Sequence, residues 1–106
     1  MRVAMFVKIA KINELEEGKI LTKSTRYTQI GLTKVGKEIF AFEDICSHDG
    51  EQISTGKLEN GCVVCPRHLA KFDLKTGEAL CMPATEPIPV YKVRVVGDDV
   101  EIDLEE

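Results

Sequence analysis

The sequence predicts an all-β fold, an antiparallel sandwich or barrel, and three observations support this prediction. Short segments rich in Val, Ile, Thr, Phe and Tyr recur along the chain. Turn residues separate these segments at regular intervals, and the C-terminal segments alternate apolar with charged residues. The chain has 106 residues, with no internal repeat, low-complexity stretch or linker, so we expect one domain over residues 1–106.

The N-terminal half is expected to contain a strand, a helical turn and a hairpin. Residues 3–10 (VAMFVKIA) are a strand candidate, and KINELEEGK is expected to form a single helical turn closed by Gly18. Residues 23–35 (KSTRYTQIGLTKV) and 38–44 (EIFAFED) are expected to be consecutive antiparallel strands with a tight turn between them.

The C-terminal half is expected to contain one more short strand and two further hairpins. GCVVC ends at Cys65, and Pro66 prevents the strand from continuing, so Cys65 is delivered to a loop. Residues 71–80 (KFDLKTGEAL) are expected to form a hairpin around Lys75 to Gly77. Residues 91–104 (YKVRVVGDDVEIDL) alternate and turn at Gly97 to Asp99, which predicts the last hairpin.

Charge and composition exclude some classes of function. Lys and Arg total 14 against 18 Asp and Glu, a net charge of -4, which argues against a nucleic-acid partner. The N-terminal apolar run is too short for a signal peptide or a membrane span, so we expect a soluble, cytoplasmic protein without a membrane partner. Thiols stay reduced in that compartment, so the four cysteines are expected to be metal ligands or buried side chains rather than disulfides.

Two mixed pairs of cysteine and histidine are the candidate site. Cys46 and His48 stand in ICSHDG, and Cys65 and His68 stand in CPRH; these are the two histidines of the chain. Both pairs fall in loops at strand ends. Structural zinc accepts two cysteines and two histidines, but its usual motifs pair cysteine with cysteine and histidine with histidine. A Rieske-type [2Fe-2S] cluster needs two cysteines on one iron and two histidines on the other, which the spacing favours over zinc.

CSH followed sixteen residues later by CPRH resembles the signature C-x-H and C-x-x-H of Rieske-type ferredoxins. FDLKTGEAL and PIPVYKVRV are similar to further segments of that family, so the resemblance covers nearly the whole chain. It implies one [2Fe-2S] cluster, with Cys46 and Cys65 as thiolate ligands of the inner iron and His48 and His68 as imidazole ligands of the outer iron. A third loop, CMPATEP, is expected to cover the cluster through Pro83.

The resemblance also implies an architecture and a function. The fold would be a Rieske-like antiparallel β-sandwich or barrel, with a cluster-binding subdomain over about 44–89 inserted between basal strands and carrying two ligand loops. The protein would be a monomeric, one-electron carrier rather than an enzyme, passing electrons from a flavin-containing NAD(P)H reductase to a terminal oxygenase. The alternatives are a fixed small subunit of a larger oxidoreductase such as nitrite reductase and, more remotely, a structural zinc module.

Departures from the family pattern make further predictions. Leu69 stands where many members have glycine directly after the second histidine. Glu51 and Arg67 stand where the Rieske subunits of respiratory cytochrome bc complexes have a pair of disulfide-forming cysteines. Ala70 and Phe72 replace the Ser and Tyr hydroxyls that bond the cluster sulfurs in those subunits, so we expect a low reduction potential.

Two cysteines remain outside the predicted ligand set. Cys62 forms a C-x-x-C with Cys65 but stands in an apolar strand, and we expect it to be simply buried. The same expectation applies to Cys81.

Overall fold

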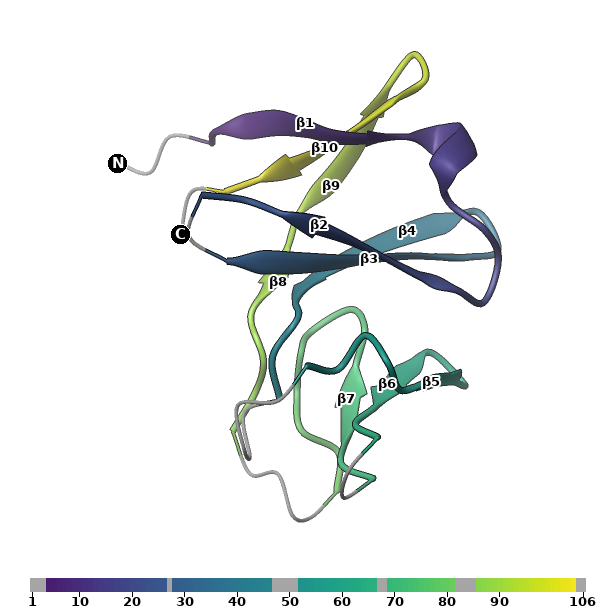
Figure 1. Ribbon diagram of the computed structural model, residues 1–106, viewed down its shortest axis with the longest axis vertical. Helices are drawn as coiled ribbons and strands as arrows, with labels where there is room; N and C mark the ends of the chain where they lie inside the picture. The colour runs from purple at the N-terminus through teal and green to yellow at the C-terminus, as the bar shows by residue number, and fades with distance from the viewer. Residues whose placement is uncertain (1–3, 27, 47–51, 67–68, 82–85, 105–106) are drawn as a thin grey trace.

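The computed structural model describes residues 4–26, 28–46, 52–66, 69–81 and 86–104. Within these ranges the regular elements are short strands and a single 3-10 turn, so the all-β prediction is confirmed (Figure 1). The elements are β1 (Phe6–Lys11), η1 (Ile12–Glu14), β2 (Ile20–Ser24), β3 (Gln29–Val35), β4 (Glu38–Glu43), β5 (Lys57–Glu59), β6 (Cys62–Val64), β7 (Lys71–Asp73), β8 (Val90–Tyr91), β9 (Val93–Val96) and β10 (Asp99–Asp103).

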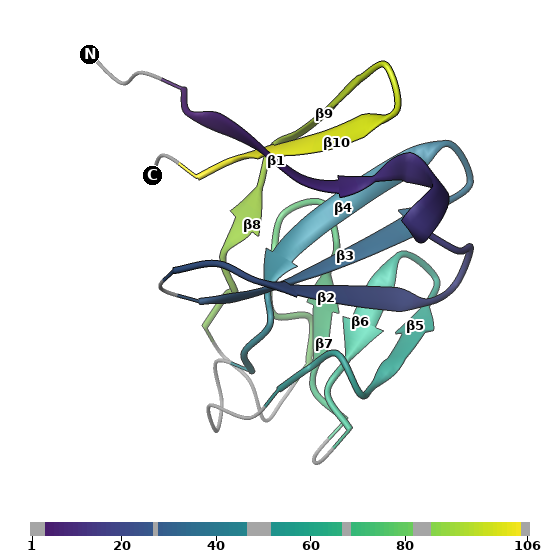
Figure 2. The ribbon, with the colours of Figure 1, turned by 45° about the horizontal axis from the view of Figure 1, so that its top comes forward.

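The strands form three antiparallel sheets that follow one another along the molecule. The first sheet has the order β1-β10-β9, the second β2-β3-β4-β8 and the third β5-β6-β7. Figure 1 shows the first sheet at the top, the third at the bottom and the second between them. Figure 2 shows that β8 and β9 run consecutively from the second sheet to the first. In chain order, the third sheet lies between β4 and β8.

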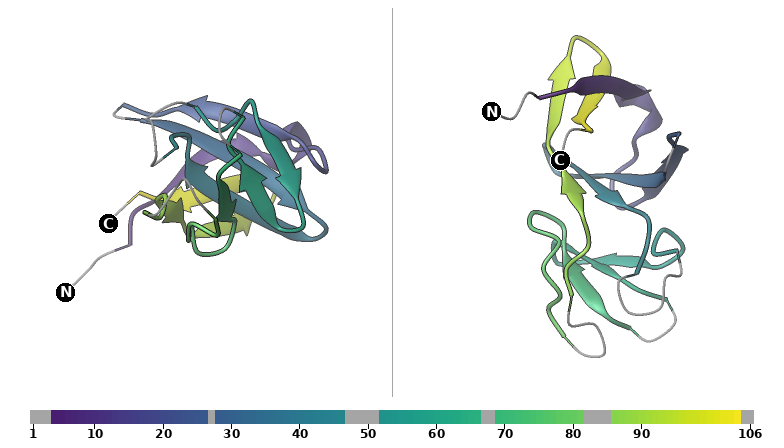
Figure 3. Two further views of the ribbon diagram at one scale, coloured as in Figure 1. Left: turned by 90° about the horizontal axis from the view of Figure 1, so that it is seen from below. Right: turned by 90° about the vertical axis from the view of Figure 1, so that its left-hand side faces the viewer.

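The middle sheet is covered on both faces, which divides the core into two clusters. Ala41 and Phe42 are adjacent on β4 and are 1% and 0% exposed, respectively. Because successive side chains of a strand point to opposite faces, Ala41 packs with Val100 and Ile102 of β10, and Phe42 packs with Val63 of β6. The side view of Figure 3 shows the upper and lower parts on either side of this sheet.

Gly31 of β3 makes room for the ring of Phe42 across the strand pair. The two residues are register partners, and a Cβ atom on Gly31 would lie 2.5 Å from Cε2 of Phe42. The aromatic ring therefore lies over the backbone of β3 and closes the top of the lower cluster.

Most of the predicted elements are present, and the main error concerns residues 23–35. The hairpins β3–β4 and β9–β10 are confirmed, and the helical turn is present as η1, but it ends at Glu14 with Leu15 as its C-cap and is not closed by Gly18. The prediction of one strand over 23–35 is wrong, because β2 and β3 form a hairpin of their own. Thr25 closes that hairpin: its backbone N–H donates to the carbonyl of Thr28 at 2.7 Å, and its side-chain oxygen accepts from the backbone N–H of Thr28 at 3.1 Å.

The third sheet contains a hairpin that our sequence reading missed. Asn60 and Gly61 connect β5 to β6 with φ of 47° and 78°. An Asn-Gly pair is the strongest short signal for a two-residue hairpin turn, since both central residues need positive φ. The stretch LENGCV, residues 58–63, was therefore sufficient to predict the hairpin between β5 and β6.

The segment before the last hairpin divides between two sheets. Tyr91 was expected on the strand of that hairpin, but in the structure it belongs to β8 and pairs with Ala41 of β4. Alternation alone could not show this, because β8 and β9 have the same pattern and differ only in their partners. Among the residues that the structure describes, none forms a helix with the length and apolarity needed to span a bilayer.

Candidate metal centre

Cys46 and Cys65, the two predicted thiolate ligands, are brought into one buried cluster. They are 1% and 0% exposed and share this cluster with Ala70, Phe72 and Ile53. Cys46 follows the end of β4 and Cys65 follows β6, so the middle and third sheets each contribute one thiol. No disulfide involves any of the four cysteines, all of which lie in the described part of the chain.

The second predicted ligand loop is closed by backbone hydrogen bonds. The N–H of Cys65 donates to the carbonyl of Ala70 at 2.7 Å, and the N–H of Leu69 donates to the carbonyl of Cys65 at 3.1 Å. Leu69 is 66% exposed and has a φ of 61°, in the left-handed region where glycine is favoured. This conformation explains why glycine suits the position, and leucine adopts it here.

The first predicted ligand loop is closed by a side chain. Asp44 is 6% exposed, and its Oδ1 accepts hydrogen bonds from the backbone N–H groups of Ile53 and Ser54 at 2.8 and 2.7 Å. Its Oδ2 accepts from Ser54 Oγ and from Gln29 Nε2, each at 2.7 Å. The sequence alone did not predict a role for Asp44. The feature that could have indicated one is an acidic residue two positions before a predicted ligand, Cys46.

The turn after β7 is packed against the chain that follows the third loop. The N–H of Ile88 donates to the carbonyl of Gly77 at 2.8 Å, and a Cβ atom on Gly77 would lie 2.0 Å from the carbonyl oxygen of Ile88. The N–H of Leu80 donates to the carbonyl of Lys71 at 2.8 Å. Position 77, in the predicted hairpin turn around Lys75 to Gly77, therefore requires glycine for two reasons: the close backbone contact and the φ of 78°.

His48, His68 and Pro83 lie outside the described residues. Within the described ranges, no group of three or more His, Cys, Asp and Glu side chains could hold a metal ion. The described donors nevertheless fit one half of a Rieske cluster, since two thiols lie in one apolar, water-excluding environment that suits soft ligands.

The two remaining cysteines differ from each other. Cys62 is half-buried, and burial, reinforced by the nearby Asp73 carboxylate, raises the pKa of its thiol above 9.0. The expectation that Cys81 is buried is wrong: it is exposed, and its Sγ lies 3.7 Å from the carbonyl oxygen of Leu69. Cys81 directly follows the predicted hairpin, next to Leu80, which is also exposed.

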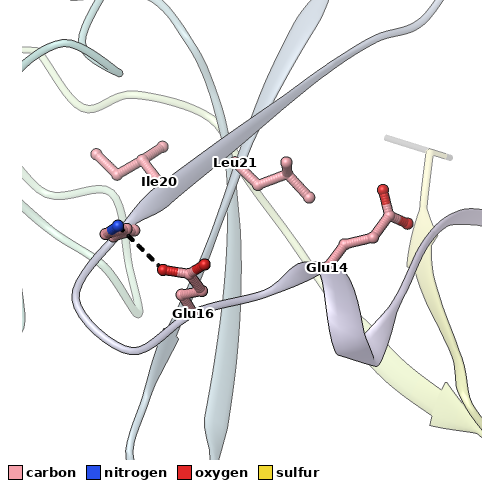
Figure 4. A pocket seen from close by; sticks show the side chains of 5 residues that line it. Glu14, Glu16, Ile20 and Leu21 are labelled. Atoms are coloured by element: carbon pink, nitrogen blue, oxygen red, sulfur yellow. Dashed lines mark ion pairs between the residues drawn. The ribbon is translucent and has the colours of Figure 1, made fainter.

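Two surface hollows differ in their relation to the site. One of about 200 Å³ lies between η1 and β2, where Lys19 pairs with Glu16 at 3.1 Å, and neither Cys46 nor Cys65, the two predicted ligands that the structure describes, lines it (Figure 4). The other, of about 420 Å³, is lined in part by Cys65, Pro66 and Leu69 and so opens beside the second ligand loop.

Comparison with known proteins identifies the family. The Rieske [2Fe-2S] domain matches residues 5–92. The 3-phenylpropionate/cinnamic acid dioxygenase ferredoxin subunit of Escherichia coli (strain K12) is 46% identical over 96 residues, covering 90% of each chain. The anthranilate 1,2-dioxygenase ferredoxin subunit of Burkholderia cepacia is 36% identical over 96 residues, covering 91% of this chain and 89% of its own.

Solved structures support the same fold. The ferredoxin of carbazole 1,9a-dioxygenase from Nocardioides aromaticivorans IC177 has a TM-score of 0.87, with 23% identity over 92% of this chain and 96% of its own. A chain in the complex of reduced oxygenase and oxidized ferredoxin in carbazole 1,9a-dioxygenase has a TM-score of 0.85, with 26% identity and 92% coverage of both chains.

The predictions of a Rieske-type fold, a [2Fe-2S] cofactor and an electron-carrying rather than catalytic role are confirmed by these comparisons. The buried Cys46 and Cys65 are the first residues of the two segments, CSH and CPRH, that carry the signature. With a family match over residues 5–92 and 46% identity to a ferredoxin subunit, the chain belongs to the Rieske [2Fe-2S] ferredoxins.

Proposed function

We propose that this ferredoxin carries single electrons from a flavin-containing NAD(P)H reductase to the terminal oxygenase of a dioxygenase system. The main support is the 46% identity, over 90% of both chains, to a dioxygenase ferredoxin subunit. The similarity to a chain in an oxygenase–ferredoxin complex supports an oxygenase as the acceptor. We further propose that the protein is a cytoplasmic monomer and that residues 44–89 are the cluster-binding part of a single domain over 1–106.

The cluster ligands in this proposal are Cys46 and Cys65 on the inner iron and His48 and His68 on the outer iron. Burial of both thiols at 0–1% exposure supports the first half of this set. The C-x-H and C-x-x-H pattern supports the second half. When bound, the iron-sulfur cluster would supply a one-electron couple. The two loops would hold it, and the buried apolar residues around Phe72 exclude water from the two thiols.

Electron transfer to a partner requires a close approach to the cluster. Leu69 and Pro66 are exposed beside the buried Cys65, at the hollow of about 420 Å³. Lys71 lines the same hollow and lies 3.7 Å from Glu59, an exposed pair that contributes little to stability and can separate. We propose that the oxygenase contacts this side of the second ligand loop and that Lys71 helps to attract an acidic surface.

The first experiment measures the cluster itself. Anaerobically purified, dithionite-reduced protein should give a rhombic electron paramagnetic resonance (EPR) signal with nitrogen coupling and about two irons per chain. A silent sample with about one zinc per chain would instead indicate the structural zinc module.

The C-x-x-C segment offers a matched pair of variants for the ligand assignment. Cys65→Ser should abolish the cluster signal, and Cys62→Ser, three residues earlier in the chain, should retain it. Loss of iron in Cys62→Ser would contradict the assignment.

Transfer between partners is tested by reconstitution. The purified protein is mixed with a dioxygenase reductase, NADH and a dioxygenase oxygenase, and oxygenase turnover is measured with and without it. Dependence of turnover on the ferredoxin, together with monomeric sedimentation, supports a diffusible carrier. Absence of transfer, combined with self-association in sedimentation, would favour a fixed subunit of a larger oxidoreductase.

A further inference from the structure

Asp44 connects the two ends of the first ligand loop through its carboxylate. The residue follows β4 directly and stands two positions before Cys46. Its Oδ1 accepts from the backbone N–H groups of Ile53 and Ser54, at 2.8 and 2.7 Å. These two donors lie at the point where the chain returns from the loop, so one oxygen atom ties the end of the loop to its beginning.

The other carboxylate oxygen fixes this closure to the middle sheet. Oδ2 accepts from Ser54 Oγ and from Gln29 Nε2, both at 2.7 Å. The backbone N–H of Asp44 also donates to the carbonyl of Gln29 at 2.8 Å. Gln29 is the first residue of β3, so the loop is anchored to a strand that lies between two neighbours in the middle sheet.

Four donors converge on the two oxygens, and this arrangement requires a carboxylate. An ionised carboxylate accepts at about four positions and donates at none. An asparagine in the same place would turn its N–H₂ group either toward Gln29 Nε2 and Ser54 Oγ together or toward the backbone N–H groups of Ile53 and Ser54. Because Asp44 is only 6% exposed, water could not easily repair the mismatch.

The closed loop leads directly into the buried cluster. Cys46 and Ile53 are 1% and 0% exposed and belong to the same cluster as Cys65. Both ends of the first ligand loop therefore lie in this cluster, and Asp44 bonds the backbone of Ile53 at one of them.

We propose that Asp44 is a positioning residue for the iron-sulfur cluster, holding the first ligand loop closed so that the Cys46 thiolate keeps its place. This inference rests on the proposed function insofar as it takes Cys46 as a ligand. Groups that hold ligands in place typically change metal affinity by about 10–100-fold when they are removed.

Asp44→Asn is the primary test, and Glu43→Gln is its matched control. Glu43 is the neighbouring carboxylate, and its Oε2 accepts from Thr28 Oγ1 at 2.6 Å, on the middle sheet and not on the loop. Both variants remove one negative charge at adjacent positions, so a difference between them reports the loop contacts and not the charge.

The measurements are the rate of cluster loss to an iron chelator, followed by visible absorbance, and the EPR spectrum of the reduced protein. We expect Asp44→Asn to lose its cluster about tenfold faster or more and to show shifted g-values. Glu43→Gln should stay within about twofold of the native rate and keep the native spectrum.

Ser54→Ala provides a second test if Asp44→Asn does not fold. It retains the carboxylate and both backbone donors but removes the hydroxyl donor at 2.7 Å. The rate of cluster loss should rise in this variant, by less than in Asp44→Asn.

The failures of the two proposals are distinguishable. A native chain that binds no [2Fe-2S] cluster refutes the proposed function and this inference with it. A native chain that holds the cluster, while Asp44→Asn and Ser54→Ala release it at the native rate with native g-values, refutes this inference alone. In that case a lower melting temperature in the variants would show that Asp44 stabilises the fold without positioning the ligand.

Discussion

The backbone N–H of Cys65 donates to the carbonyl of Ala70 at 2.7 Å, so the second ligand loop begins and ends at one hydrogen bond. Both residues are fully buried, whereas Leu69 between them is 66% exposed. The turn back to Ala70 places Leu69 at a φ of 61°. A residue other than Gly, Asn or Asp is disfavoured in this left-handed conformation by about 1–2 kcal/mol.

Leu69→Gly is therefore expected to stabilise the protein. Removing the side chain relieves the left-handed strain and sacrifices little burial, because the side chain is mostly in solvent. Part of the gain is offset by the greater entropy of glycine in the unfolded chain, so we expect about 1 kcal/mol. The melting temperature of the anaerobic holoprotein measures the change.

Leu80→Gly is the control for this substitution. Leu80 is also an exposed leucine, at 47%, but does not have a positive φ. Glycine should destabilise the protein at this position. Equal effects of the two substitutions would contradict the strain argument.

The reduction potential should lie near the low end of the Rieske range, which runs from about −150 to +300 mV. Ala70 and Phe72 are fully buried in the hydrophobic core cluster that contains Cys65. Neither side chain has a hydroxyl to donate to a sulfur atom of the iron-sulfur cluster. Ala70→Ser and Phe72→Tyr should each raise the midpoint, because hydrogen bonds to sulfur stabilise the reduced cluster. Redox titration followed by EPR measures the change.

Phe40→Tyr serves as the control. Phe40 packs against the same hydrophobic core cluster from the middle sheet and is only partly buried. Its added hydroxyl should leave the midpoint unchanged. A native midpoint above about +100 mV would refute the prediction.

Thiol labelling should separate the two cysteines outside the ligand set. Cys81 is exposed, whereas Cys62 is half-buried and its pKa is raised above 9.0 by burial, with a further contribution from the Asp73 carboxylate. At pH 8 the holoprotein should therefore react with iodoacetamide at Cys81 first, since the thiolate is the reacting form and must be accessible. Peptide mass spectrometry of a labelling time course measures both rates, and Cys81→Ser should remove the fast phase.

Acid should weaken the contact between η1 and β2. The Glu14 carboxylate accepts from Lys23 Nζ at 2.8 Å and from the backbone N–H of Lys11 at 2.7 Å, and these contacts lower its pKa below 4.5. A depressed carboxyl pKa stabilises the folded state above the unfolded value, and this stabilisation is lost as the pH falls from about 4.5 through the folded pKa. The Glu14 side chain is visible beside Leu21 in Figure 4.

Glu14→Gln should therefore show a smaller loss of stability between pH 7 and pH 3 than the native protein does. Urea unfolding at the two pH values measures the loss, and Glu16→Gln removes a more exposed carboxylate of the same segment as a control. An unchanged pH dependence in Glu14→Gln would show that other carboxylates dominate acid unfolding.

Local patterns were sufficient for part of this structure. The hairpins around Gly36 and Gly97 need positive φ at these glycines, at 62° and 61°, and turn chemistry is encoded within a few residues. The Asn60-Gly61 hairpin is equally local, since its turn depends on two adjacent residues with positive φ. Over residues 23–35, the turn at Thr25 was not recognised because Thr and Tyr are enriched in strands, although this preference depends on context.

By itself, the sequence determined the all-β class, the family and the two pairs of candidate ligands, since these depend on residue type and short spacing. Only the tertiary structure decided which strands share a sheet, that Cys46 and Cys65 share a buried cluster, and that the Asp44 carboxylate bonds Ile53, Ser54 and Gln29. The physical reason is that burial and hydrogen-bond partners depend on contacts between segments far apart in the chain, which propensity and spacing do not describe.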